Sequence, residues 1–251
     1  MLRTKTFLTL AALLGVPALT LSAHWFGHDD RYEETREFTL PADRDVITVD
    51  GNQNGGVHLI GWNRDEIVVR AKITIHDRDD DDAEELAERI EIDLGPTIRA
   101  DGPGHKWSVS FEIHAPYQSN LKLRTHNGGI HIEDMTGDIQ FEAKNGGIHL
   151  NRIGGNVTGR TTNGGVHVQL QGDRWEGEKL DVVTTNGGVK LRLPEDYSAR
   201  LETGTVNGGV DVDFPITVRG RINRNVNATL GDGGATIRLR TTNGGVDIRG
   251  S

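Results

Sequence analysis

The tripeptide Asn-Gly-Gly recurs seven times in this chain and constrains its fold more than any other feature. The last six copies follow one another at intervals of 18, 18, 23, 21 and 36 residues. A period near twenty indicates stacked structural units, each too small to bury a hydrophobic core alone. The copies begin at Asn54, Asn127, Asn145, Asn163, Asn186, Asn207 and Asn243.

Apolar residues keep the same offsets from each asparagine of the last six copies. The position six residues earlier is always aliphatic, and so are the positions three and five residues later. All three offsets fall on one face of a strand, so each unit is predicted to be a strand, a glycine corner and a second strand. The residues six positions before the asparagines are Leu121, Ile139, Val157, Leu180, Leu201 and Ile237.

This pattern predicts an all-β fold, a β-solenoid in which like side chains stack about 4.8 Å apart. Stacking of this kind would let the corner asparagines form a hydrogen-bonded ladder. Glycine permits a positive φ at the corner, so Gly146→Val is expected to cost about 1–2 kcal/mol. An antiparallel β-meander is the alternative, because Asn-Gly between apolar runs is also a hairpin signal.

The chain divides into three segments. Residues 1–23 hold a basic start at Arg3 and Lys5 and an uncharged apolar run, which together predict a cleaved export signal. An uncleaved N-terminal anchor is the alternative, and either fits a periplasmic or cell-surface protein. Residues 24–36 are expected to be a polar tether. Residues 37–251 form one β-repeat domain with regular repeats from about residue 121 and one short helix near 82–90.

Composition excludes several kinds of function. The formal net charge is −9, which disfavours nucleic acid as a partner. Cysteine is absent, so thiolate metal sites and cysteine nucleophiles are excluded. An acidic run at Asp77 and Asp79–Asp82 suits the start of the short helix better than calcium, because the spaced pattern of a calcium loop is missing.

The repeats resemble a known group, the family of bacterial "putative adhesins" with β-strand repeats, whose function is unknown. The resemblance covers residues 37–251 and involves Val49–Gly51, the strand end Ile113–Pro116, the Asn-Gly-Gly-Val units, and Leu191–Pro194 leading into Ala199. It implies an exported, envelope-associated β-solenoid. It supplies no catalytic residues.

Histidine occupies one outward position in consecutive repeats, at His131, His149 and His167, and His58 matches it in the first copy. Imidazoles stacked at this spacing could hold Zn²⁺ or Ni²⁺, with Glu133 nearby. The same position carries Lys190, Asp211 and Asp247 in other repeats, which favours an ordinary solvated face. A metal-binding envelope protein is therefore the alternative to a plain binding module.

The second corner of each unit varies in length, and insertions of this kind often carry a binding face. The long segments are 169–179, which includes Arg174 and Trp175, and 213–236. Both side chains are candidate binding residues, although Trp175 could instead cap a neighbouring coil. No cap follows the last strand pattern at residues 246–249, so self-association through this end of the solenoid is expected.

Together these features predict an exported, non-enzymatic, adhesin-like module that binds an unidentified envelope or surface ligand, with no required cofactor. A polysaccharide-active β-helix enzyme is a third alternative, for which close acidic pairs such as Asp211 with Asp213 or Glu178 with Asp181 would have to line a groove.

Overall fold

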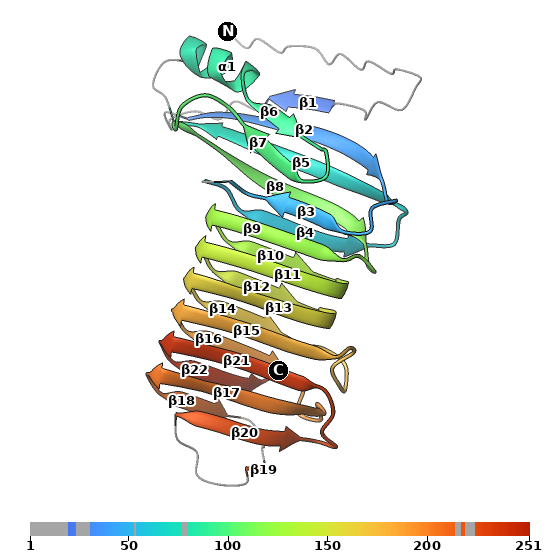
Figure 1. Ribbon diagram of the computed structural model, residues 1–251, viewed down its shortest axis with the longest axis vertical. Helices are drawn as coiled ribbons and strands as arrows, with labels where there is room; N and C mark the ends of the chain where they lie inside the picture. Colours follow the sequence, from blue (N-terminus) through green and yellow to red (C-terminus); the bar gives the residue numbers. More distant parts are fainter. Residues whose placement is uncertain (1–19, 24–30, 53, 77–79, 214–216, 219–223) are drawn as a thin grey trace.

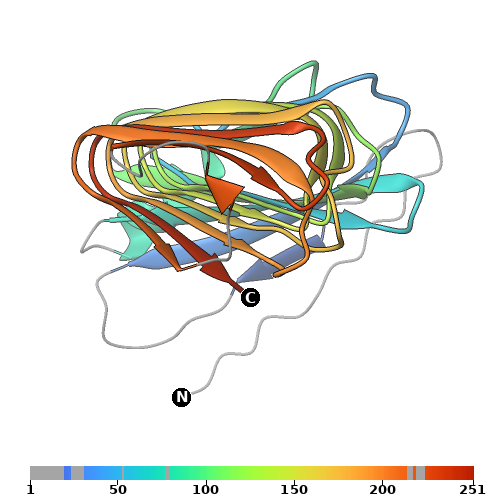
Figure 2. The same cartoon turned by 90° about the horizontal axis from the view of Figure 1, so that it is seen from below.

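The strands of this chain form two long sheets that face one another along a single stack of coils (Figure 1). The computed structural model describes residues 20–23, 31–52, 54–76, 80–213, 217–218 and 224–251. Within these residues each sheet has eleven strands. We call the sheet that contains β10 sheet A and the sheet that contains β9 sheet B. Viewed along the stack, the two sheets lie as flattened layers joined by corners (Figure 2).

Each regular coil runs along sheet B, turns at Asn-Gly-Gly, and returns along sheet A. The sheet B strands are β9 (Leu121–Asn127), β11 (Thr136–Asn145), β13 (Gly154–Asn163) and β15 (Lys179–Asn186). The sheet A strands are β10 (Ile130–Glu133), β12 (Ile148–Asn151), β14 (Val166–Gln169) and β16 (Val189–Leu193). Neighbouring coils pair in parallel and in register, with Asn145 opposite Asn163. The predicted solenoid is confirmed, and the antiparallel meander is wrong for these coils.

The core lies between the sheets and consists of the predicted aliphatic positions. Ile139, Val157 and Leu180 of sheet B are fully buried, as are Ile148 and Val166 of sheet A. Burial of one such side chain contributes about 1.5–3 kcal/mol to stability. Because like residues stack on like residues in every coil, this burial stabilises the predicted register.

The glycine corners are tight for a different reason from the one expected. Gly146 does not have a positive φ, but a Cβ added to it would lie 2.0 Å from the carbonyl oxygen of Gly128 in the neighbouring coil. The first glycine of the corner is therefore required by close backbone approach between coils.

The C-terminal coil is not the end of the stack. Its strands β21 (Thr236–Asn243) and β22 (Val246–Gly250) lie between the β15–β16 coil and the coil made by β17 (Ala199–Asn207) and β18 (Val210–Asp213). The expectation of an uncapped edge at residues 246–249 is wrong, since β22 pairs with β16 and β18. In sheet B the end is extended by β20 (Asn225–Leu230), antiparallel to β17, and by β19 (Thr217–Val218). Part of the segment expected as a variable loop is thus strand.

The other end of the stack repeats this insertion. The coil of β3 (Ile47–Asp50) and β4 (Val57–Trp62) lies between β9–β10 and the later strands β7 (Ile98–Asp101) and β8 (Trp107–Pro116). Sheet A continues antiparallel through β5 (Glu66–Ile75), β2 (Tyr32–Pro41) and β1 (Thr20–Ala23), and sheet B ends at β6 (Glu91–Asp93). Helix α1 (Asp80–Glu88) packs at this end through buried Ala83 and Ala87, close to the helix predicted at 82–90.

The expected tether at 24–36 is wrong in its second part. Strand β2 begins at Tyr32, and its Glu34 is only 5% exposed. Arg36 bonds to Glu34 at 2.8 Å and donates to the carbonyls of Ala87 and Ile90 at the end of α1. A cation at a helix C-terminus satisfies its free carbonyls, which explains this polar sequence within a strand.

Residues 1–19 and 24–30 lie outside the described residues, so the export signal and the first part of the tether stay predictions. No helix in the described part of the chain has the length and apolar character needed to cross a bilayer.

Candidate ligand and metal site on sheet A

Four histidines stack on the outer face of sheet A, in the order His58, His131, His149 and His167. Each is the register partner of the next, across strands β4, β10, β12 and β14. We call this set the histidine row. The ring centroids of successive pairs lie 4.5, 5.5 and 4.7 Å apart. The ladder predicted from the repeats is present, because parallel in-register coils place equivalent residues side by side.

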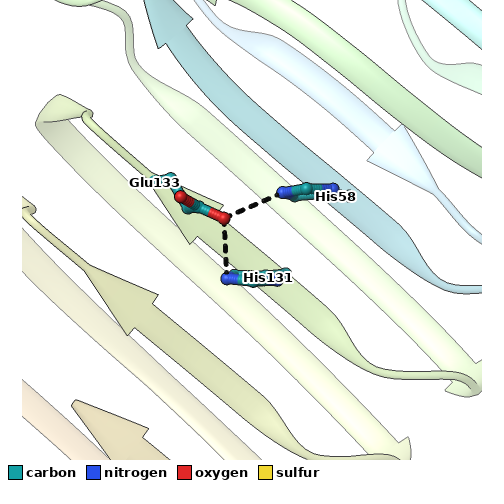
Figure 3. A group of neighbouring side chains, drawn as sticks. All are labelled: His58, His131 and Glu133. Atoms are coloured by element: carbon teal, nitrogen blue, oxygen red, sulfur yellow. Dashed lines mark hydrogen bonds and ion pairs between the residues drawn. The ribbon is translucent and has the colours of Figure 1, made fainter. Parts of the chain in front are cut away.

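One rung of the row contains a carboxylate. Glu133 follows His131 by two residues on β10, so both side chains project from the same face. The Oε1 atom of Glu133 lies 3.2 Å from Nε2 of His58 and 3.0 Å from Nε2 of His131. The two imidazoles are stacked with an interplanar angle of 15° (Figure 3). Three atoms able to bind a metal therefore converge within 4.8 Å of one another.

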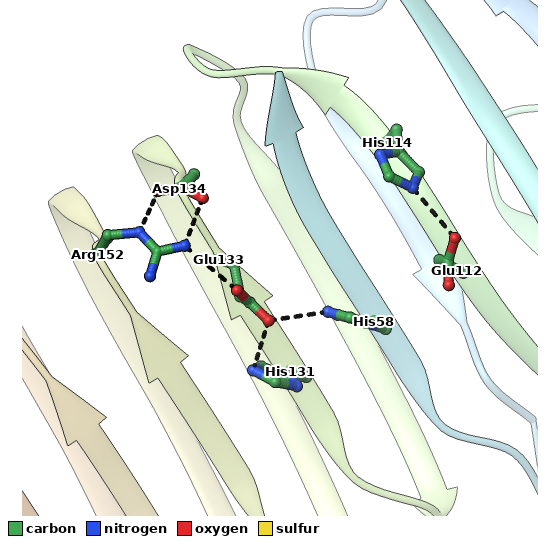
Figure 4. A network of polar contacts seen from close by, with 7 residues as sticks. All are labelled: His58, Glu112, His114, His131, Glu133, Asp134 and Arg152. Carbon is green, nitrogen blue, oxygen red and sulfur yellow. Dashed lines mark hydrogen bonds and ion pairs between the residues drawn. The ribbon is translucent and has the colours of Figure 1, made fainter.

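The second oxygen of Glu133 is oriented by an arginine. Arg152, at the turn after β12, places Nη2 3.4 Å from Oε2 of Glu133 and 2.7 Å from Oδ2 of Asp134 (Figure 4). The hydrogen bond from Arg152 to Asp134 is the main reason that the pKa of the Asp134 carboxyl lies below its usual range. Arg152 thus faces Oε2, while Oε1 faces the histidines.

Beyond His58 the row continues into an ion-paired cluster. Arg70 on β5 bonds to Glu37 at 2.6 Å and to Glu112 at 2.9 Å, and His114 lies 3.1 Å from the same Glu112 oxygen. Burial raises the pKa of Glu112, but the bonds from His114 and Arg70 outweigh it and leave the pKa lowered. At this end of the row one arginine is thus shared by two carboxylates.

Two histidines of the row, His131 and His167, have a pKa below the ordinary value and so favour the neutral form. Burial lowers the pKa of His131 first, and the neighbouring His58 and His149 lower it further against the opposing effect of Glu133. Burial also lowers the pKa of His167, with Lys190 and Arg192 among the further causes. Neutral imidazole is the form that binds metal or accepts a hydrogen bond.

Two hollows flank the row. One, of about 560 Å³, is lined by His58, His131 and His149 together with Arg70, Lys72 and Glu112. The other, of about 350 Å³, lies around His131, His149 and His167. Its further polar lining is Asn151, Gln169, Lys190 and Arg192. Among the ion pairs of the described residues none involves Lys190 or Arg192, so this second hollow is a polar surface with two unneutralised cations.

The predicted metal ligands are only partly brought together. His131 belongs to the cluster with Glu133, but its third member is His58 rather than His149 or His167. The reason is the residue that occupies the position of Glu133 on the next coils, which is Asn151 on β12 and Gln169 on β14. Sequence alignment of the repeats placed His58 in the row, and the same alignment could have shown that Glu133 is the one carboxylate at its position among the repeats that carry a histidine.

The two predicted binding residues of segment 169–179, Arg174 and Trp175, lack a free side chain. Trp175 is 5% exposed and donates from Nε1 to the carbonyl of Gly155 at 3.1 Å, so it caps a neighbouring coil and leaves almost no indole surface for a ligand. Arg174 is exposed but pairs with its neighbour Asp173 at 3.2 Å. Lys190 and Arg192, which sequence reasoning did not select, are the freer cations.

Three of the four acids in the pairs predicted for an enzyme are bound by arginines. Arg249 contacts Asp211 at 3.1 Å and Asp213 at 3.2 Å, and Arg238 contacts Asp181 at 3.2 Å. Of the described residues lining the two hollows, Glu112 is the one carboxylate. The acidic run considered for calcium lies partly outside the described residues at Asp77 and Asp79.

One known protein family matches this chain over most of its regular coils. The family model described as Toastrack DUF4097 matches residues 108–249, which is more than half of the chain. The chain belongs to the Toastrack DUF4097 family. The match begins in β8 and runs through the regular coils to β22, so it includes His131, Glu133 and the rest of the row except His58. A search of curated proteins finds no match.

Three solved structures illustrate how distant the structural likenesses are. A "putative cell adhesion protein" from Clostridium sporogenes is 12% identical, covers 94% of this chain and 100% of its own, and has a TM-score of 0.47. A "putative adhesin" from Bacteroides fragilis is 12% identical over 87% and 97% of the two chains, with a TM-score of 0.37. A "putative lipid binding protein" from Parabacteroides distasonis is 11% identical over 87% and 96%, with a TM-score of 0.34. At these TM-scores the likeness carries no functional inference.

Proposed function

We propose that this Toastrack protein is an exported, non-enzymatic module of the cell envelope that binds an extended anionic polymer, of the acidic-polysaccharide class, on the outer face of sheet A. The observation that carries the proposal is the hollow of about 350 Å³ beside His149 and His167. Its wall combines the cations Lys190 and Arg192 with the amides of Asn151 and Gln169.

The chemistry of this wall suits sugar acids. Carboxylates of a polysaccharide would pair with Lys190 and Arg192, and charge-assisted hydrogen bonds of this kind are stronger than neutral ones. The amides of Asn151 and Gln169 and the imidazole of His167 can donate to and accept from hydroxyl groups. A flat sheet face that continues over several coils is suited to a long polymer rather than to a small enclosed substrate.

Two further features support a binding module over an enzyme. The contacts of His58, His114 and His131 with acidic side chains join them to Glu133 and Glu112. A nucleophilic mechanism would instead need a hydroxyl held by one of these imidazoles. The basic and apolar start of the chain at residues 2–21 supports export, as the sequence predicts.

The test is a titration of the purified chain with an acidic polysaccharide and with its uncharged counterpart, followed by calorimetry at low salt. We expect binding of the acidic polymer alone, weakened at least about tenfold by the double variant Lys190→Gln, Arg192→Gln, since rim charges contribute mainly through electrostatics. Lys122→Gln with Lys144→Gln, two exposed cations of sheet B, is the matched control. Equal binding by both double variants would contradict the proposal.

A further inference from the structure

The rung formed by His58, His131 and Glu133 has a composition that no other rung of the described solenoid repeats. Two imidazole nitrogens face one carboxylate oxygen at 3.2 and 3.0 Å. The three side chains come from β4 and β10, and Glu133 lies 75 residues from His58 in sequence. We propose that this rung is a divalent transition-metal site of the His₂Glu type, which binds Zn²⁺.

The distances fit a metal as well as a hydrogen bond. Zinc binds histidine nitrogen and carboxylate oxygen at about 2.0–2.2 Å in tetrahedral geometry, which places ligand atoms about 3.4 Å apart. The separations of 3.2 and 3.0 Å between the carboxylate oxygen and the two nitrogens need to widen by a few tenths of an ångström, and all three ligand atoms lie within 4.8 Å of one another. Side chains that are 35%, 40% and 23% exposed for His58, His131 and Glu133 can make this adjustment and can be reached by the ion.

Neighbouring contacts orient the side chains of the proposed ligands. Arg152 faces Oε2 of Glu133 at 3.4 Å, so Oε1 is the oxygen directed at the metal position. Groups outside the ligand set that orient the ligands in this way are typical of metal sites. Near-parallel stacking of the two rings at 4.5 Å points both Nε2 atoms to the same side (Figure 3).

Three protein ligands leave a fourth coordination position for water or for a ligand group. Two of the three ligands, His58 and His131, line the hollow of about 560 Å³. His149 lines this hollow as well, but its own coil carries Asn151 where β10 carries Glu133. The site is therefore assigned to the β4–β10 rung and not to the row as a whole. This inference does not rest on the polysaccharide proposal, because His131 is the one proposed ligand that also lines the hollow beside Lys190 and Arg192.

The test is calorimetric titration of the purified full chain, free of any histidine tag, with Zn²⁺ at neutral pH. We expect one ion per chain. Glu133→Gln and His58→Gln should each weaken binding at least about tenfold, as loss of a metal-site group does. His149→Gln and His167→Gln are matched controls from the same row and should bind as the unmodified chain does. Circular dichroism checks that each variant is folded.

Glu133→Gln keeps the size of the side chain and its capacity to hydrogen-bond, so it separates metal ligation from a structural role. Absorption of the Co²⁺-loaded chain gives a second readout, since tetrahedral Co²⁺ has d–d bands that are lost with a ligand. Absence of Zn²⁺ binding, or unchanged binding in both Glu133→Gln and His58→Gln, would overturn the proposal. Loss of binding in His149→Gln equal to that in His58→Gln would also overturn it, because the ion would then lie elsewhere in the row.

Discussion

Asn145 donates a hydrogen bond of 2.7 Å from its side-chain Nδ2 to Oδ1 of Asn127 on the neighbouring coil. The same bond joins every pair of stacked corner asparagines, at 2.7–3.1 Å, from Asn54 at one end to Asn207 at the other. Each amide inside this ladder donates to one neighbour and accepts from the other. The predicted asparagine ladder is confirmed, and it runs along the exposed corner of the solenoid.

Replacing an asparagine inside the ladder should cost more than replacing one at its end. Asn163→Ala removes two bonds and Asn207→Ala removes one. Each such bond contributes about 0.5–1.5 kcal/mol net, so we expect losses of about 1–3 and about 0.5–1.5 kcal/mol in the free energy of unfolding. Urea denaturation measures both. Equal losses in the two variants would show that the ladder does not act through its bonds.

The two glycines of one corner should differ sharply in their tolerance of alanine. A Cβ at Gly146 would lie 2.0 Å from the carbonyl oxygen of Gly128, whereas a Cβ at Gly147 would lie 3.5 Å from that of Gly165, an ordinary contact. We expect Gly146→Ala to destabilise the chain by about 1–3 kcal/mol through overpacking, and Gly147→Ala to have little effect. Thermal unfolding of the pair checks this. A large loss in Gly147→Ala alone would reverse the assignment.

Ala143 interrupts a row of threonines, and replacing it with threonine should stabilise the fold. At the equivalent positions Thr161 and Thr184 donate from Oγ1 to a glycine carbonyl of the adjacent coil at 2.8 and 2.7 Å. We expect Ala143→Thr to add one bond of this kind and to stabilise the fold by about 0.5–1.5 kcal/mol. Ala143→Val, which has the same shape without the hydroxyl, is the control. A threonine variant no more stable than the valine variant would contradict the prediction.

His167 should make stability depend on pH below neutrality. Burial, then the neighbouring His149, Lys190 and Arg192, lower its pKa from the ordinary 6.5. The unfolded chain then takes up a proton more readily than the folded chain, so stability is complete above about pH 6.5 and falls as the pH drops through the lower folded pKa. We expect His167→Gln to lose less stability between pH 7.5 and 5 than the unmodified chain. Identical pH profiles in urea denaturation would contradict this.

Much of the solenoid follows from local sequence. The constant offsets around Asn145 and Asn163 predict which residues are buried, because alternation at a fixed phase allows only one face to reach the core. The same offsets predict the asparagine ladder and the histidine row. The polar composition of Tyr32–Arg36 misleads, because this segment is a strand whose charged side chains are paired with each other, with the end of α1 and with Lys72.

The order of the coils was decided by tertiary structure. Every coil presents nearly the same edge to its neighbours, so the repeat pattern does not specify which coils pair. The C-terminal coil therefore inserts ahead of β17–β18, and the coil of β3–β4 inserts between β7–β8 and β9–β10. The sequence by itself determined the unit, its register and its buried face through spacing alone. Only long-range strand pairing placed His58 beside His131 and Glu133, because that contact depends on which edges meet.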